Sequence, residues 1–71
     1  MEDINTKFYY SQKVMIIKGF NRGRSGTVKE YQINKDETIS YLVEIENKES
    51  GKKITEMIAE NFLKKYSFLP F

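Results

Sequence analysis

The stretch from Lys13 to Val28, KVMIIKGFNRGRSGTV, constrains the fold of this 71-residue chain more than any other stretch. It begins with β-forming apolar residues, passes through three of the chain's four glycines, and ends at the start of a second apolar run. Val14 and Ile16 lie on one face of an extended chain, so a strand is expected over 13–18. The stretch therefore predicts a strand, a basic glycine loop and a second strand.

Two longer strands are expected after this loop. In the second strand, over 27–33, Val28 and Tyr31 are three positions apart, which breaks strict alternation and predicts either a bulge or strong coiling of the strand. The third strand, over 39–46, alternates cleanly. One face should lie in the core (Tyr41, Val43 and Ile45) and the other mostly in solvent (Ser40, Leu42, Glu44 and Glu46).

The elements that the sequence predicts after the third strand are short. A polar turn, a hairpin loop ending in Gly51 and a fourth strand over 52–58 lead to one helical or 3-10 turn over 59–63. A last short strand is expected over 64–66. Short strands at intervals of about ten residues predict an all-β fold, a small five-stranded barrel with a short 3-10 turn before the last strand.

The composition indicates one small domain over 1–71, with no room for two cores. Residues 1–7 and 67–71 are expected to be flexible tails or tails that dock on a partner. The chain has no cysteine and no histidine, so we expect no disulfide, no metal site and no cofactor. The commonest general base is also missing, which argues against an enzyme.

The first ten residues, MEDINTKFYY, are acidic rather than basic and lack the apolar run of a secretory signal. No apolar stretch approaches the length that crossing a bilayer requires. The sequence therefore predicts a cytoplasmic protein without a membrane partner.

Charge is distributed unevenly along the chain, although the net charge is only +2. Between residues 13 and 29 there are five basic residues and no acid: Lys13, Lys18, Arg22, Arg24 and Lys29. Between residues 36 and 49 there are five acidic residues and one lysine. This polarity can steer an anionic partner towards the glycine loop even when the total charge is small.

The order Val14-x-Ile16-Ile17-x-Gly19-x-x-x-Gly23-x-x-Gly26-x-Val28 resembles the KOW motif. That motif occurs in large-subunit ribosomal proteins and in NusG-type transcription elongation factors, where it forms part of an SH3-like barrel. The resemblance covers about residues 13–29 and implies an SH3-like fold and a binding role. Its known members bind ribosomal RNA, other nucleic acid or protein, so all three partners stay open.

Five residues are candidates for contacts with nucleic acid, RNA more than DNA: Lys18, Phe20, Arg22, Arg24 and Lys29. The basic side chains offer donors for phosphates, and an aromatic ring offers a stacking surface for bases. The alternative is a solvated cluster that keeps a small protein soluble. Gly19, Gly23 and Gly26 are expected to be structural turn glycines that supply positive φ and close backbone approach.

Seven aromatic residues are expected to lie mostly in the core, because so small a barrel needs large side chains: Phe8, Tyr9, Tyr10, Tyr31, Tyr41, Phe62 and Tyr66. Their alternative role is a base-stacking platform or a cage for a partner side chain. The C-terminal Phe68, Leu69 and Phe71 are candidates for protein contact. Through this tail and the barrel surface, the chain could instead be a protein-interaction module or a homo-oligomer.

Overall fold

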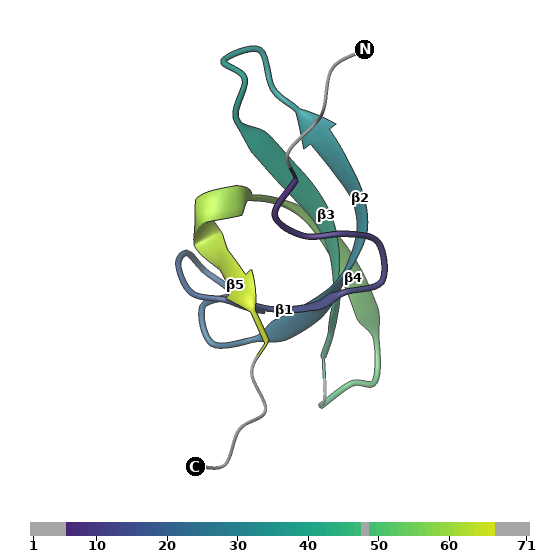
Figure 1. Cartoon of the computed structure of the whole chain (residues 1–71). Helices are drawn as coiled ribbons and strands as arrows, with labels where there is room; N and C mark the ends of the chain where they lie inside the picture. Colours follow the sequence, from purple (N-terminus) through teal and green to yellow (C-terminus); the bar gives the residue numbers. More distant parts are fainter. Residues whose placement is uncertain (1–5, 48, 67–71) are drawn as a thin grey trace.

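The computed structural model describes residues 6–47 and 49–66 and shows an all-β chain (Figure 1). Its strands are β1 (Lys13–Ile16), β2 (Ser25–Ile33), β3 (Ile39–Glu46), β4 (Lys53–Ala59) and β5 (Leu63–Lys65), with a 3-10 turn, η1 (Glu60–Phe62), before β5. They form one antiparallel sheet in the order β4-β3-β2-β1-β5. The predicted all-β fold with five strands and a late 3-10 turn is confirmed. In this part of the chain no helix has the length and apolarity needed to span a bilayer.

Strand ends differ from the sequence prediction by one or two residues. β1 ends at Ile16 rather than at Lys18, and the N–H of Ile17 donates to the carbonyl of Phe62 in η1 at 2.8 Å. The last strand begins at Leu63, one residue earlier than predicted. At the end of β1 the difference arises because the apolar run continues through Ile17, past the point where the backbone leaves the ladder.

The predicted bulge in β2 is present. Pairing with β3 shifts between Val28 and Glu30, which leaves Lys29 as the additional residue. A bulge bends its strand and increases the local twist. The sheet accordingly curls around a central space, as Figure 1 shows, and the core side chains fill that space.

The core is built from alternate residues of the strands together with Phe8. Its buried members are Phe8, Val14, Ile16, Val28, Tyr41, Val43, Ile45, Ile58 and Leu63. The predicted core face of β3 is therefore confirmed. Ser40 was expected in solvent but is buried, because it lies between Gln32 of β2 and Ala59 of β4 in the sheet. Its Oγ accepts a hydrogen bond from Asn34 Nδ2 at 3.1 Å.

The sheet has two outer strands, β4 and β5. Within the described residues no strand pairing joins them. η1 instead leads from the end of β4 to the start of β5 and packs Phe62 against the core. The curled sheet is thus completed by a turn between its edges rather than by a further ladder.

The segment before β1 docks on the core through the hydroxyl of Tyr41. This oxygen accepts hydrogen bonds from the N–H of Lys7 at 3.0 Å and of Phe8 at 3.3 Å. It donates to Glu60 Oε2 at 2.5 Å, and the rings of Phe8 and Tyr41 meet edge to face at 5.2 Å. Lys7, the last residue of the stretch expected to be a tail, is therefore in contact with the core; residues 1–5 lie outside the described residues.

Candidate nucleic-acid interface

The loop between β1 and β2 is held by its own backbone. The N–H of Gly23 donates to the carbonyl of Ile16 at 2.8 Å, and the N–H of Ile16 donates to the carbonyl of Arg24 at 2.8 Å. Inside the loop, Arg22 N–H reaches the carbonyl of Gly19 and Arg24 N–H reaches that of Asn21. Because these bonds close the loop at its base and along its length, its side chains project from a defined backbone.

The three glycines of this stretch have two different roles. Gly19 and Gly23 have φ values of +91° and +93°, which side chains with a Cβ seldom adopt. Gly26 lies inside β2, where an added Cβ would lie 2.5 Å from Val43 Cγ1 and 2.7 Å from the carbonyl oxygen of Glu44. Two of the predicted turn glycines therefore lie in turns, and the third allows β2 and β3 to approach closely.

One side chain ties the loop to the opposite edge of the sheet. Asn21 is buried, and its Nδ2 donates to Oε1 of Glu56 on β4. Sequence analysis did not identify this contact, since Glu56 reads as an outward-facing carboxylate near an edge. An asparagine between two glycines gives no signal for its partner 35 positions away.

The tip of the loop carries the most exposed large apolar side chain of the described residues. Phe20 is 99% exposed. Lys18, Arg22 and Arg24 are exposed as well, and within the described residues none of them forms an ion pair. Four of the five predicted contact residues thus lie on this one loop, three of them basic and the fourth an uncovered aromatic ring.

Lys29 does not belong to this group. It lies on β2 at the bulge, five residues beyond Arg24, or roughly 16 Å of extended chain. Its Nζ is 3.7 Å from Glu44 Oε1 and 5.9 Å from the centre of the Tyr10 ring. The sequence places Lys29 in the same basic run, but the direction of β2 carries it away from the loop.

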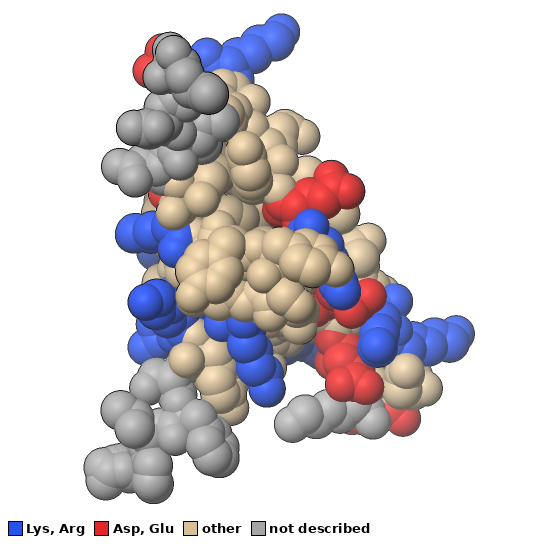
Figure 2. All heavy atoms as spheres, turned by 45° about the vertical axis from the view of Figure 1, so that its right-hand side comes forward, with Lys and Arg blue, Asp and Glu red and all other residues tan. Residues whose placement is uncertain are grey.

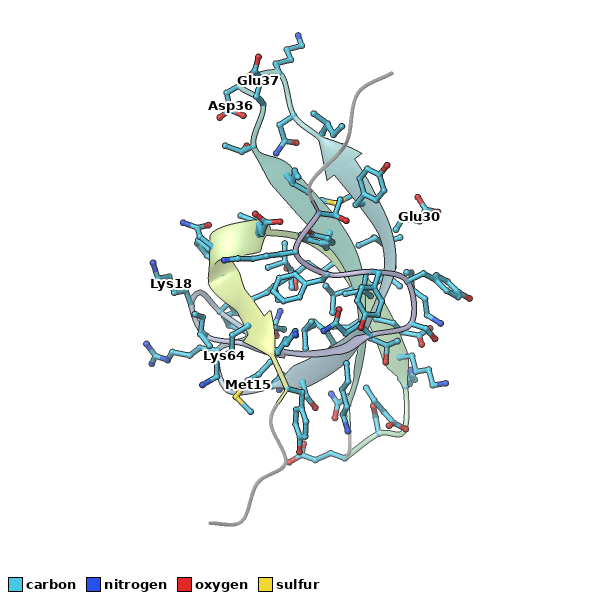
Figure 3. The ribbon with its side chains drawn as sticks, in the orientation of Figure 1. Met15, Lys18, Glu30, Asp36, Glu37 and Lys64 are labelled. Atoms are coloured by element: carbon cyan, nitrogen blue, oxygen red, sulfur yellow. The ribbon has the colours of Figure 1, made fainter. Side chains whose placement is uncertain are left out.

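Basic residues of β5 extend the cationic surface of the loop. Lys64 pairs with Met15 across the β1–β5 ladder, and Figure 3 shows Lys64, Met15 and Lys18 on the same side of the molecule. Lys65 is also exposed. In Figure 2 the lower left of the described surface shows basic groups without acidic neighbours, whereas acidic groups gather on the right among basic ones. The sequence did not indicate that Lys64 and Lys65 belong with the loop, because Lys64 lies 40 positions beyond Arg24.

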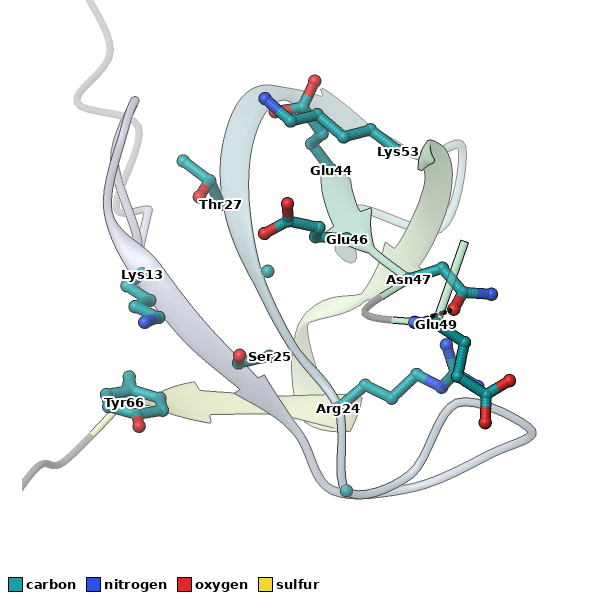
Figure 4. A pocket seen from close by; sticks show the side chains of 12 residues that line it. Lys13, Arg24, Ser25, Thr27, Glu44, Glu46, Asn47, Glu49, Lys53 and Tyr66 are labelled. Carbon is teal, nitrogen blue, oxygen red and sulfur yellow. Dashed lines mark hydrogen bonds between the residues drawn. The ribbon is translucent and has the colours of Figure 1, made fainter. Parts of the chain in front are cut away.

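Arg24 also lines a hollow of about 650 Å³ on the outer face of the sheet (Figure 4). The hollow contains carboxylates and cations together: Glu44, Glu46, Glu49, Lys13, Arg24 and Lys53. Ser25 and Thr27 form part of its wall. Because the charges are mixed, this surface has no clear preference for an anion.

Among the described residues, the two groups with perturbed acidity lie elsewhere. Burial raises the pKa of the Tyr41 hydroxyl, and its hydrogen bond to Glu60 raises this pKa further. Hydrogen bonds from the side chain and backbone of Thr38 lower the pKa of Asp36, at the tip of the β2–β3 hairpin. Among the described residues, no three His, Cys, Asp or Glu side chains are grouped to hold a metal ion.

The prediction that most aromatic residues lie in the core is wrong for three tyrosines. Tyr9, Tyr10 and Tyr31 are 68%, 70% and 47% exposed, and they line a groove of about 370 Å³. Tyr9 and Tyr10 occupy a tight turn in which Ser11 has a φ of +75°, so the chain reverses and turns both rings outward. Phe8 takes the interior position instead. The predicted contact tail, Phe68, Leu69 and Phe71, lies outside the described residues.

Comparison of the chain with protein-family models, with curated proteins and with solved structures gave no match. The functional assignment therefore depends on the residues of the chain and their arrangement.

Proposed function

We propose that this chain is a non-enzymatic binding module of the KOW, SH3-like type that binds nucleic acid through the loop between β1 and β2. The observation that carries the proposal is the uncovered Phe20 ring on an internally hydrogen-bonded loop beside Lys18, Arg22 and Arg24. An aromatic face stacks on bases, and neighbouring cations contact the phosphates between them. Lys64 and Lys65 lengthen the cationic path along β5.

RNA is the preferred partner in this proposal. Sequence-reading proteins bind RNA mostly at loops, bulges and single strands, where unstacked bases lie on aromatic side chains. A single exposed ring on a short loop suits such a base better than a paired one inside a duplex. The cytoplasmic location predicted from the sequence agrees with this role.

The test is a fluorescence-anisotropy titration of a labelled single-stranded RNA across salt concentrations. Three phosphate contacts, from Lys18, Arg22 and Arg24, should give a slope of log K against log salt of roughly −2. Phe20→Ala should weaken binding by about 1–3 kcal/mol at every salt concentration. Arg22→Glu should weaken binding and make the slope shallower, since a phosphate contact is lost.

Lys35→Glu supplies the matched control, since it makes the same charge reversal at the distant tip of the β2–β3 hairpin. Equal losses for Arg22→Glu and Lys35→Glu would mean that net charge, and not the loop, determines affinity. Duplex DNA that binds as tightly as the single-stranded RNA would contradict the preference for RNA.

A further inference from the structure

β4 forms an edge of the sheet, and most of it is uncovered. It pairs with β3 over its whole length, from Glu46↔Lys53 to Ser40↔Ala59. In an antiparallel ladder, alternate residues turn their N–H and C=O groups away from the neighbouring strand. Lys53 to Met57 are all exposed, with Ile54 at 48% and Met57 at 45%. A long edge that carries exposed apolar side chains is a site for pairing with another strand.

Among the described residues, other parts of the chain approach only the C-terminal half of this edge. Asn21 contacts Glu56 there, and a small hollow of about 160 Å³ separates the loop from Met57 and Ile58. Within the described residues, Lys53, Ile54 and Thr55 form no side-chain hydrogen bond or ion pair, and their backbone groups bond only within the ladder to β3. A partner strand must therefore dock at the N-terminal half of β4.

We propose that this partner is a second copy of the chain, whose β4 pairs antiparallel with the first β4 across a two-fold axis. The sequence around Ile54 is self-complementary in that arrangement. With the axis at Ile54, the two Ile54 side chains face each other and Lys53 lies opposite Thr55. Lys52 of each copy then lies opposite Glu56 of the other, which gives two cross-strand pairs of opposite charge.

Neighbouring registers form less favourable cross-strand pairs. Side chains that lie directly opposite each other must be on the same face of the sheet. The two-fold axis can therefore pass only through the position of a residue of β4, and the alternative registers differ by one residue in this position. An axis at Thr55 places Ile54 opposite Glu56, and an axis at Glu56 places two carboxylates opposite each other. Both also shift the partner towards the half of the edge that Asn21 approaches. Charge pairing and access therefore select the same register.

This interface extends the sheet from one copy into the next and closes with two copies, as two-fold contacts do. Lys18, Phe20, Arg22 and Arg24 form no part of it, and Ile54→Lys leaves Glu56, the partner of Asn21, unchanged. The two proposals can therefore fail independently.

The first experiment is sedimentation equilibrium of the full chain over a wide concentration range. We expect the mass to rise from the 8.4 kDa of one chain towards twice that value. Ile54→Lys should hold the mass at that of one chain throughout. The matched control is Ile33→Lys, which changes an isoleucine of equal exposure (49%) at the far end of β2, and it should still dimerise.

The second experiment uses complementary charges. Lys52→Glu places two carboxylates opposite each other in both cross-strand pairs, and Glu56→Lys places two ammonium groups opposite each other in both. Each variant alone should therefore remain monomeric. In an equal mixture every cross-strand pair has opposite charges, and dimers should return. Circular dichroism of each variant shows whether it is folded before mixing.

A wild-type chain whose mass stays at that of a single chain at all concentrations would overturn the proposal. So would dimers of Ile54→Lys as strong as those of Ile33→Lys. If the mixture of folded charge variants remains monomeric while the wild type dimerises, the two-fold register centred on Ile54 is wrong. If a chain ending at Tyr66 loses the dimer while Ile54→Lys keeps it, the C-terminal tail is the interface instead.

Discussion

Gly26 shows how a missing side chain can set the spacing between two strands. It lies inside β2, opposite Ile45 in the ladder to β3, where glycine ordinarily weakens a strand. The position of Val43 and of the Glu44 carbonyl leaves no room for a Cβ there. At Gly23 the backbone conformation alone is the constraint, because an added Cβ would meet nothing within 4 Å. At Gly19 the positive φ is joined by limited space, since an added Cβ would lie 3.2 Å from Phe62 Cε2.

Gly26→Ala should therefore destabilise the fold by about 3 kcal/mol, because the contact with a backbone oxygen is relieved only if the strands separate. Gly23→Ala should cost only about 1 kcal/mol, since its strain is confined to one positive φ. Urea unfolding followed by circular dichroism measures both losses. Equal losses at the two positions would show that crowding between β2 and β3 is not the constraint at Gly26.

At the scale of elements, the loop between β1 and β2 is fastened twice: by backbone bonds at its base and by Asn21 at its tip. The second attachment reaches Glu56 and so joins the loop to an edge strand that it does not pair with. The position of Phe20, next in sequence to Asn21, depends on this attachment. The tether therefore links the stability of the loop to its binding surface.

Asn21→Ala should cost about 1.5–3 kcal/mol of stability, the net contribution of a hydrogen bond to a charged group. Its larger effect should be local: amide exchange of Arg22 and Gly23 should become faster, while that of β3 stays as in the wild type. Hydrogen exchange followed by NMR measures both. Asn61→Ala, an exposed asparagine in η1, is the control and should leave the loop amides unchanged.

Sequence patterns predicted the positions of the strands better than they predicted which side chains are exposed and which are grouped together. Alternation in Tyr41, Val43 and Ile45 located β3 and its core face, because period-two burial is a local property of a strand. The same local rules could not show that Phe8 would displace its neighbouring tyrosines from the core. They also could not show that Lys29 would leave the basic group, since that depends on the path of β2 in space.

At the scale of the whole molecule, Tyr41 joins three parts of the chain that are distant in sequence. Its ring lies in the core, and its hydroxyl contacts the backbone of the segment before β1 and the carboxylate of η1. The raised pKa of this hydroxyl means that the folded state favours its neutral form. Loss of the proton at alkaline pH would place an anion beside Glu60 inside the fold.

The sign of the pH effect follows from this direction. The stability that neutral Tyr41 contributes is complete below its ordinary pKa of 10.0 and is lost as the pH rises through the higher folded value. Tyr41→Phe should cost about 1–3 kcal/mol at neutral pH, because the N–H groups of Lys7 and Phe8 lose their acceptor. It should also remove the part of the alkaline loss that belongs to this hydroxyl.

Thermal unfolding from pH 7 to pH 11 tests both statements, with Tyr31→Phe as the exposed control. The control should match the wild type at every pH. A Tyr41→Phe variant with wild-type stability at neutral pH would mean that the segment before β1 does not depend on this hydroxyl.

The pairing of β1 with β5 has a consequence for the order of folding. Val14 lies opposite Lys65, so β1, the first described strand, receives its second neighbour only when β5, the last described strand, emerges. Contacts of such sequence separation slow folding, because a long loop must close before they form. A nascent chain can assemble the hairpins from β1 to β4 early, but its core remains open on one side until β5 has been synthesised.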